Sequence, residues 1–275
     1  MRLKDHTLPI GERTCIMGVL NVTPDSFSDG GRYIDPEKAA ERIKGMVDEG
    51  ADVIDIGGES TRPGADGIST SEELQRIMPV IKAVKGTLSV PLSVDTYKSE
   101  VARQALMGGV SIVNDITALH GDPEMAGTIA EFDAGVVLMH MKGTPATMQK
   151  SPDYGDVIEE ILSYLEGSIR IALDAGIDPE KIIIDPGIGF GKKLEHNLAI
   201  LKDLKRLRQL GKPLLVGTSR KSFIGELTGK DIRDREFGTA ASVALAAANG
   251  ADMIRVHDVG SMKDVMRVVD AIRKA

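Results

Sequence analysis

Polar side chains recur in this chain at one kind of position, directly after short apolar runs that predict buried strands. The run at 181–184 contains three β-branched residues in succession, which is typical of a parallel strand covered on both faces, and Asp185 follows it. A carboxylate at the carboxyl end of such a strand lies where parallel α/β folds bind their ligands. The residues that share this placement are Asn21, Asp55, Asp95, Asn114, Asp115, His140, Asp185, Ser219, Arg220, Lys221, Arg255 and His257.

Part of this strand-end set could bind a flat heterocycle. Asp95, Asn114 and Asp185 can form a fixed array of hydrogen bonds, because a carboxylate matches the adjacent N–H donors of an amino-pyrimidinone edge. Lys221 could donate to the carbonyl side of such a ring. Each member alone could equally cap a helix or pair with a surface charge, but nearly every repeat supplies one. The candidate apolar walls are Ile116, Met139 and Phe190. For Ile116 and Met139, packing in the core is the alternative.

A second group of residues suits phosphate. Arg62, Arg255 and His257 can hold the oxygens of a phosphate or diphosphate. A helix that starts soon after His257 would add backbone N–H donors. Asn21 offers an oxygen ligand suited to Mg²⁺, which keeps most of its waters and binds through a substrate's phosphate. The chain therefore has the residues for a phosphorylated heterocyclic substrate.

Other ligand motifs fit poorly. The third glycine of Gly187–Gly191 comes too early for a dinucleotide-binding loop, and residues 217–222 lack the glycine spacing of a Walker loop. His140 and His257 with a carboxylate could form a zinc site, but no close pair of histidines supports one.

The elements that must position these residues follow a repeating plan. Each expected strand is followed by a helical pattern, and eight such units of roughly 35 residues fill the 275-residue chain without a linker. Eight units favour a closed (β/α)₈ TIM barrel as a single domain over 1–275, with an open doubly wound sheet as the alternative. Pro79 lies inside one helical pattern and predicts a kink or an early stop. The expected strands cover residues 14–20, 51–56, 91–94, 110–113, 135–139, 181–185, 213–216 and 251–254.

Composition narrows the class of protein. A hydrophobic content of 42% supports a sizeable core, and the net charge of −7 argues against a broad nucleic-acid surface. The single Cys15 lies in an apolar strand pattern, which predicts a buried small side chain and a reducing compartment. The first residues, Met1 to Glu12, are polar and lack an apolar signal core, and no stretch approaches the length of a membrane span. These features predict a soluble cytoplasmic protein with small-molecule partners and neither nucleic-acid nor membrane partners.

Two loops and several short motifs resemble the dihydropteroate synthases, a family of pterin-binding TIM-barrel enzymes. The loops are residues 21–31 (NVTPDSFSDGG) and 57–64 (GGESTRPG), and the resemblance runs from about Thr14 to Arg273. Family members often have Phe where this chain has Ile188, an apolar exchange that leaves the assignment intact. The supporting motifs are Val94-Asp95-Thr96, Val113-Asn114-Asp115, Asp185-Pro186-Gly187, Ser219-Arg220-Lys221-Ser222 and Arg255-Val256-His257.

The resemblance implies that a barrel joins p-aminobenzoate to 6-hydroxymethyl-7,8-dihydropterin diphosphate and releases 7,8-dihydropteroate and diphosphate. It implies no covalent nucleophile, and it implies a homodimer, for which the last helices are candidates. By resemblance, the pterin is held by Asp95, Asn114, Asp185 and Lys221. The diphosphate is held by Arg62, Arg255 and His257, with Asn21 on Mg²⁺. The p-aminobenzoate site is bordered by Phe27, Thr61, Pro63, Phe190 and Ser222. Met139 and Val256 are further expected substrate contacts, and the expected catalytic residues are Arg62, Asp95, Asp185 and Lys221.

Two other functions remain open from the sequence. A pterin-dependent methyltransferase would share the Asp and Asn array, but it would not need the loops at 21–31 and 57–64. A pterin-binding protein without activity would keep the site, but no signature residue looks eroded.

Overall fold

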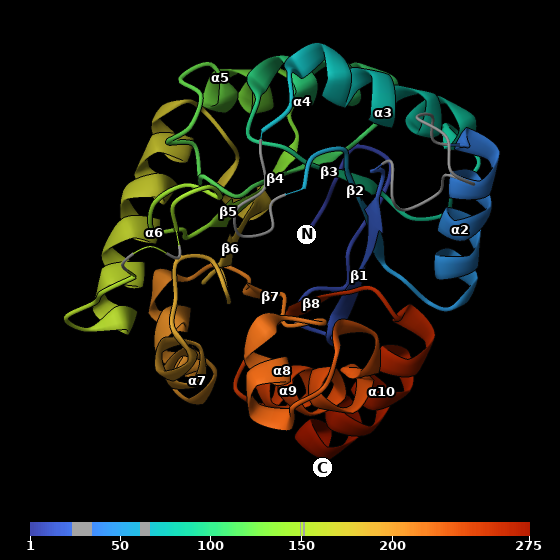
Figure 1. The fold of residues 1–275 in the computed structure, drawn as a ribbon. Helices are drawn as coiled ribbons and strands as arrows, with labels where there is room; N and C mark the ends of the chain where they lie inside the picture. Colours follow the sequence, from blue (N-terminus) through green and yellow to red (C-terminus); the bar gives the residue numbers. More distant parts are fainter. Residues whose placement is uncertain (24–34, 61–66, 149, 151) are drawn as a thin grey trace.

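A computed structural model describes residues 1–23, 35–60, 67–148, 150 and 152–275 of the chain. Eight parallel strands form its centre and helices surround them (Figure 1). The strands are β1 (Cys15–Asn21), β2 (Val53–Gly57), β3 (Leu92–Asp95), β4 (Ile112–Asp115), β5 (Gly135–Met139), β6 (Ile182–Asp185), β7 (Leu215–Val216) and β8 (Met253–Val256). The helices are α2 (Pro36–Asp48), α3 (Thr70–Val84), α4 (Ser99–Gly108), α5 (Met125–Glu131), α6 (Val157–Asp174), α7 (Leu194–Lys202), α8 (Ser222–Thr228), α9 (Glu236–Ala248) and α10 (Val259–Lys274).

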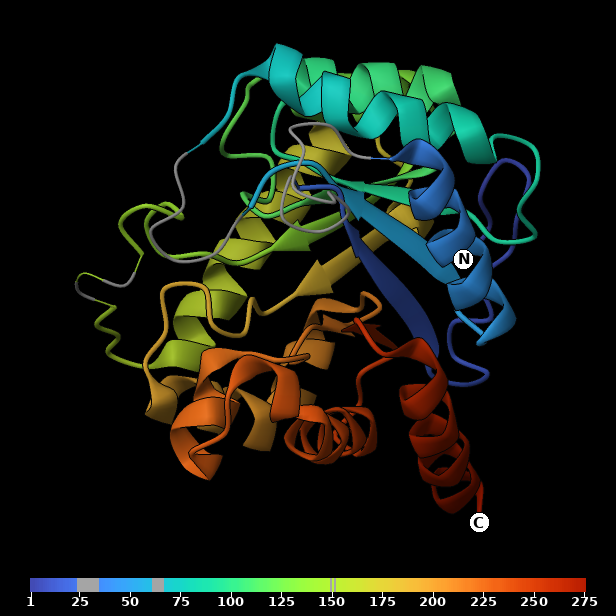
Figure 2. The same ribbon diagram turned by 45° about the vertical axis from the view of Figure 1, so that its right-hand side comes forward.

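The strand order closes the sheet on itself. Neighbours run β6-β5-β4-β3-β2-β1-β8-β7, and a parallel bridge from Ile184 to Leu214 joins the two ends. Both views show the strands as a twisted ring inside the helices (Figures 1 and 2). The prediction of a (β/α)₈ barrel is thus confirmed, and the open-sheet alternative is wrong.

Alternation along the strands separates an inner from an outer core, because successive strand residues point to opposite faces of the sheet. One set fills the barrel at its amino-terminal end, where Leu3 and Leu8 of the first segment pack against it. The inner residues of this layer are Cys15, Met17, Val53, Ile112, Val137, Ile183, Leu215 and Met253. Alternate strand residues such as Ile54, Val113 and Ile184 face the helices instead. Cys15 is fully buried, as predicted, and burial raises the pKa of its thiol to about 12.

Three helical details differ from the sequence patterns. Helix α3 continues five residues beyond Pro79, which is exposed on the outer face, so the early-stop prediction is wrong. The segment after β6 forms two elements, α7 and a 3₁₀ helix at Leu204–Leu210, where one helical pattern was expected after the strand. The short helix α8 precedes α9 after β7 and was not expected. Among the described residues, no helix is both long and apolar enough to span a membrane.

Candidate active site

The strand-end polar residues gather at the carboxyl-terminal mouth of the barrel because they share one parity along their strands. Asp55 lies two residues after Val53, Asn114 two after Ile112, and Arg255 two after Met253, so each continues the inward-facing row above an inner core residue. Asp185 continues the row above Ile183 in the same way. The barrel therefore brings together residues that lie up to 200 positions apart in sequence.

An ion-pair network forms the floor of this mouth. The Arg255 guanidinium donates to Asp55 Oδ2 through Nε and to Asp95 Oδ2 through Nη2, both at 2.7 Å. Asn114 Nδ2 donates to the same Asp55 oxygen at 3.0 Å. Asp55 thus orients both Arg255 and Asn114, a role that the sequence did not assign to it. Arg255 was expected on diphosphate, whereas its guanidinium here is held by two carboxylates.

Two carboxylate oxygens in this floor remain available for a ligand. Asp55 Oδ1 and Asp95 Oδ1 are buried and accept no hydrogen bond from any described residue. A buried acceptor without a donor is costly, so it favours a ligand that brings N–H groups. Burial raises the pKa of Asp95, and the Arg255 charge opposes that rise. Asp95 therefore offers a buried hydrogen-bond acceptor of the kind predicted for the N–H donors of a heterocycle.

The turn after β6 presents the second predicted carboxylate. Asp185 Oδ1 accepts the backbone N–H of Gly187 at 2.7 Å, and no described residue donates to its other oxygen. Burial raises the pKa of Asp185 to about 6, while the Gly187 N–H and the Lys221 ammonium oppose the rise. Asp185 is thus a carboxylate at neutral pH and still accepts protons in a mildly acidic solution.

Lys221, in the loop after β7, is the remaining member of the predicted pterin-binding set. Its ammonium lies 4.0 Å from the ring centroid of Phe190, and the position that a Cβ atom would take on Gly189 is 3.7 Å from Lys221 Nζ. Burial and the Arg255 charge lower the pKa of Lys221 to about 8, against the attraction of Asp185 and Asp95. Asp95, Asp185 and Lys221 therefore lie close enough together at this end of the barrel to interact electrostatically.

Apolar side chains border this polar floor. Ile116, Met139, Met141 and Met148 form a separate buried cluster, against which Tyr97 and Phe190 pack. The predicted walls Ile116, Met139 and Phe190 belong to it, so a flat ring entering the mouth would meet methionine sulfur and an aromatic face.

His257, one of the residues predicted to hold diphosphate, follows directly on β8. Its Nδ1 lies 3.0 Å from Ser219 Oγ, and burial with the Arg255 charge lowers its pKa to about 4. A neutral imidazole with Nδ1 on the serine hydroxyl can donate from Nε2 to an anionic oxygen. The expected helix begins at Val259, where the preceding Asp258 pairs with Arg220 instead of capping the helix.

Asn21 occupies the matching position at the end of β1. Its amide oxygen and Asp95 Oδ2 lie 3.8 Å and 3.7 Å from the position of a Cβ atom on Gly57, so they flank one point above the strand. No described residue hydrogen-bonds to the Asn21 side chain. Within the described residues, no group of three His, Cys, Asp or Glu could hold a metal. One hard oxygen donor without an acidic cluster fits Mg²⁺ that binds mainly through a phosphorylated substrate.

Some strand-end residues serve other purposes. Asp115 points away from the mouth and caps the next turn, accepting from Thr117 N and Leu119 N. The Val256 side chain faces the helices in the outer core, so only its backbone can reach a substrate. Ser222 is exposed at the first residue of α8. The expected residues Phe27, Thr61, Arg62 and Pro63 lie outside the described residues.

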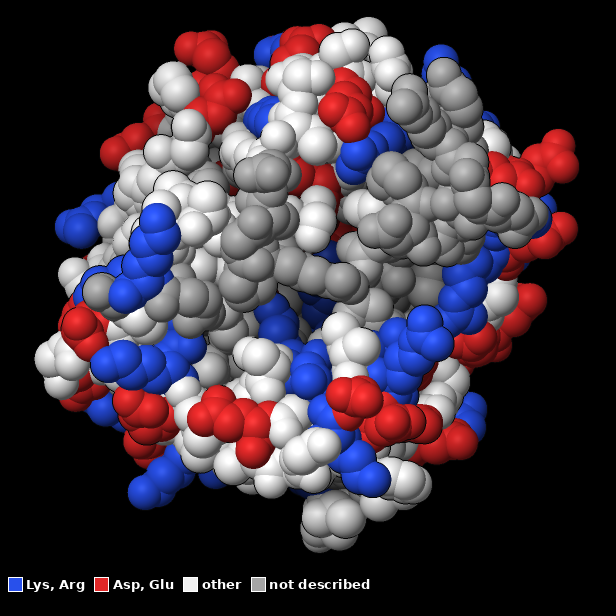
Figure 3. Space-filling model, viewed as in Figure 1, with Lys and Arg blue, Asp and Glu red and all other residues white. Residues whose placement is uncertain are grey.

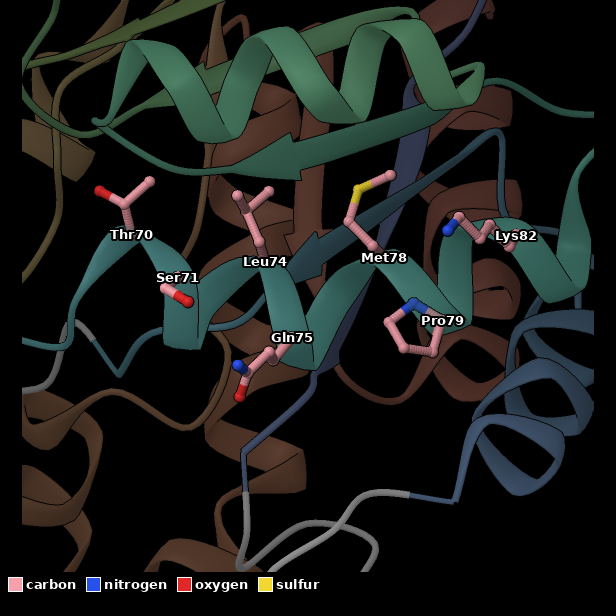
Figure 4. Close-up of a pocket in the computed structure, with 7 residues that line it drawn as sticks. All are labelled: Thr70, Ser71, Leu74, Gln75, Met78, Pro79 and Lys82. Carbon is pink, nitrogen blue, oxygen red and sulfur yellow. The ribbon is translucent and has the colours of Figure 1, made fainter.

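The surface supports the barrel mouth as the site. Lys and Arg side chains gather at the centre of the face that looks along the barrel axis (Figure 3). A hollow also lies on the outer face of α3, between Thr70 and Lys82 (Figure 4), but it is open, and Lys82 is the one ionisable side chain among the described residues that line it. We therefore assign the active site to the mouth.

Known proteins resemble this chain over nearly its full length. The model of the family described as pterin binding enzyme matches residues 17–257. A dihydropteroate synthase from Synechocystis is 48% identical and covers 95% of this chain and 91% of its own. Two structures of dihydropteroate synthase from Xanthomonas albilineans are also similar. One, with 4-aminobenzoic acid, has a TM-score of 0.90 at 44% identity, covering 96% of this chain and 94% of its own. The other, with 7,8-dihydropteroate, has a TM-score of 0.86 at 41% identity, covering 96% and 95%.

Proposed function

Because the chain belongs to the pterin-binding enzyme family, we propose that it acts as a dihydropteroate synthase in folate biosynthesis. It transfers the pterin-6-ylmethyl group from 6-hydroxymethyl-7,8-dihydropterin diphosphate to p-aminobenzoate and forms 7,8-dihydropteroate and diphosphate. The observation that carries this proposal is the set of Asp95, Asn114, Asp185 and Lys221 at one barrel mouth, beside an apolar wall. This set matches the donors, acceptors and flat faces of a pterin.

The reaction needs stabilisation of charge rather than a nucleophilic side chain. The bond between the methylene carbon and the diphosphate oxygen breaks, and the amine nitrogen of p-aminobenzoate forms a new bond to that carbon and then loses a proton. If the first bond breaks early, the pterin carries positive charge, and Asp95 and Asp185 stabilise it from the pocket floor. The arylamine is a free base at neutral pH, so no strong general base is required.

At the other end, the protein binds the leaving group. His257 and the backbone N–H groups at the start of α10, other than that of Gly260, which donates to Glu49, hold diphosphate oxygens. Asn21 would hold a Mg²⁺ ion whose charge neutralises the departing diphosphate. The Arg255 guanidinium, fixed by Asp55 and Asp95, adds positive charge between the two halves of the site.

An Asn21→Ala variant tests the magnesium proposal. We expect its half-saturating Mg²⁺ concentration to rise by about tenfold, because one of few protein ligands is lost. Turnover at saturating Mg²⁺ should recover most of its original rate. Initial rates over a Mg²⁺ titration measure this. The matched control is Asn249→Ala, because the Asn249 amide donates to Leu201 O at the end of α7. An unchanged Mg²⁺ dependence would remove Asn21 from the metal site.

The proposed function is tested by diphosphate release. Release that requires both the pterin diphosphate and p-aminobenzoate supports the synthase. A methyltransferase would release none, and would instead consume methyltetrahydrofolate with a corrinoid acceptor. A protein that binds the pterin but releases no diphosphate under any condition would be a binding protein without this activity.

We further propose that the chain forms a homodimer in the cytoplasm through its last helices. Helices α9 and α10 lie side by side (Figure 1), and both carry exposed apolar side chains. They are Phe237, Leu245, Val268 and Ile272. Phe237 is 88% exposed, which is unusual for a large aromatic side chain without a partner. A monomer in sedimentation velocity at micromolar concentration would contradict the dimer.

A further inference from the structure

Lys192 is a buried amine that the proposed reaction does not use. Burial lowers its pKa to about 7, so its ammonium carries a charge mainly below neutral pH. Only 3% of the residue is exposed, and it follows directly on the turn Pro186–Gly191. Its ammonium contacts no carboxylate of the described residues within ion-pair distance. It lies 2.9 Å from His140 Nδ1 and donates to Phe190 O at 3.0 Å and His140 O at 3.4 Å. A buried charge held only by neutral acceptors is costly, and so calls for an explanation.

Several contacts besides those of Lys192 hold the turn against the end of β5 and against the segment after it. His140 N donates to Asp185 O at 2.9 Å, and Tyr154 Oη donates to Gly191 O at 2.7 Å. The backbones approach so closely that a Cβ atom on Gly187 would lie 2.0 Å from His140 O. Gly187 also has a φ of 66°, which glycine adopts without strain. The Lys192 ammonium joins both sides of this contact, since it reaches carbonyls of His140 and Phe190.

The turn carries two groups of the pterin site. Asp185 opens it, and the Phe190 ring lies under the Lys221 ammonium near its end. His140 stays a neutral acceptor for Lys192, because burial and the Lys192 charge lower its pKa to about 2. Lys192 thus contacts the turn that carries Asp185 and Phe190.

We propose that Lys192 is a positioning residue of the pterin site, which fixes the turn that presents Asp185 and Phe190 and places a positive charge behind the Asp185 carboxylate. The inference rests on the proposed function, because it names what Lys192 does for the same ligand. The charged groups that face Asp185 are Lys192 from its own turn, Lys221 from the loop after β7, and Arg255 from β8. Those that face Lys192 are Asp185 and Lys221.

Two consequences separate this role from a purely structural one. Without the Lys192 hydrogen bonds, the turn keeps its contacts with His140 N and Tyr154 Oη but is held less firmly. The affinity for the pterin diphosphate then falls by roughly tenfold or more. Without its charge, the pKa of Asp185 rises above its value of about 6, because Lys192 is one of the groups that lower it. Pterin binding needs the ionised Asp185 carboxylate. The pH below which binding weakens, here called the acid limit of binding, therefore moves to a higher value.

The experiment measures binding of 6-hydroxymethyl-7,8-dihydropterin diphosphate by calorimetry between pH 5 and pH 9, for the full chain. The variants are Lys192→Met, which removes charge and donors, and Lys192→Gln, which keeps an amide donor. Lys193→Met is the matched control, because Lys193 is exposed and pairs with Asp153. We expect both Lys192 variants to shift the acid limit upward, Lys192→Met to lose more affinity, and the control to match the unaltered chain.

Each outcome has a distinct meaning. If the unaltered chain binds no pterin diphosphate at any pH, the proposed function fails. If it binds and both Lys192 variants keep its affinity and acid limit, the positioning role is overturned while the function stands. Loss of the fold in both variants, seen as lost ellipticity, would also overturn the role, because Lys192 would then serve stability rather than the site.

Discussion

An Asp185→Asn variant should bind 6-hydroxymethyl-7,8-dihydropterin diphosphate at least about 100-fold more weakly than the unaltered chain. The Asp185 carboxylate uses one oxygen for Gly187 N–H, and its other oxygen is the acceptor proposed for the ring. An amide loses the charge and can turn an N–H₂ group toward the N–H donors of the ligand. Calorimetric titration of the folded variant measures this loss.

The same variant should lose the acid limit of binding. The pKa of Asp185 is raised to about 6, mainly by burial, so the acceptor is charged above that pH and protonated below it. Binding by the unaltered chain therefore weakens as the pH falls through about 6, whereas an asparagine has no proton to gain at that position. Only the contribution of Asp95, whose pKa burial also raises, would remain.

Asp115→Asn is the matched control for this experiment. Asp115 is also a buried carboxylate at the end of a strand, but it caps the turn after β4 and faces away from the mouth. We expect the control to lower the free energy of unfolding by about 1 kcal/mol while its pterin affinity stays unchanged. Equal losses of affinity in the two variants would show that Asp185 acts only through the fold.

Lys221→Met should weaken pterin binding by about 30-fold or more and remove the alkaline limit of binding. Methionine keeps the apolar stem over the Phe190 ring but loses the ammonium and its charge. Burial lowers the pKa of Lys221 to about 8, so the unaltered chain loses this charge, and with it affinity, as the pH rises through about 8. The two variants should thus each remove one limb of a bell-shaped pH dependence.

Binding titrations from pH 6 to pH 10 measure this, with the exposed Lys230→Met at the end of α8 as control. If binding by Lys221→Met still weakens as the pH rises through about 8, another group causes that loss, and the proposed donor role of Lys221 would be withdrawn.

Much of this site was predictable from strand ends alone. A run of β-branched residues that ends in Asp185 locates a parallel strand and its carboxyl end, because local burial on both faces sets the residue types. The register of the repeats then places Asp95 and Asn114 at the same end of the barrel. The loops at 21–31 and 57–64 identified the family without any coordinates, and the comparisons confirmed it.

The tertiary structure decided what each strand end does. Asp115 and Asn114 are neighbours in sequence, but the pleat turns one toward the next helix and the other into the barrel. Asp55 gained its role only because closure of the barrel brings Arg255 from β8 beside it. The buried charge of Lys192 likewise has meaning only through its contact with β5.

The chain by itself thus determined the fold class, the polar ends of the strands and the family, since these depend on local burial patterns and short motifs. Which side chains pair, which face the pocket and which protons they hold depend on distances between segments far apart in the chain. Those distances, and the burial that shifts the pKa values of Asp185 and Lys221, exist only once the barrel has closed.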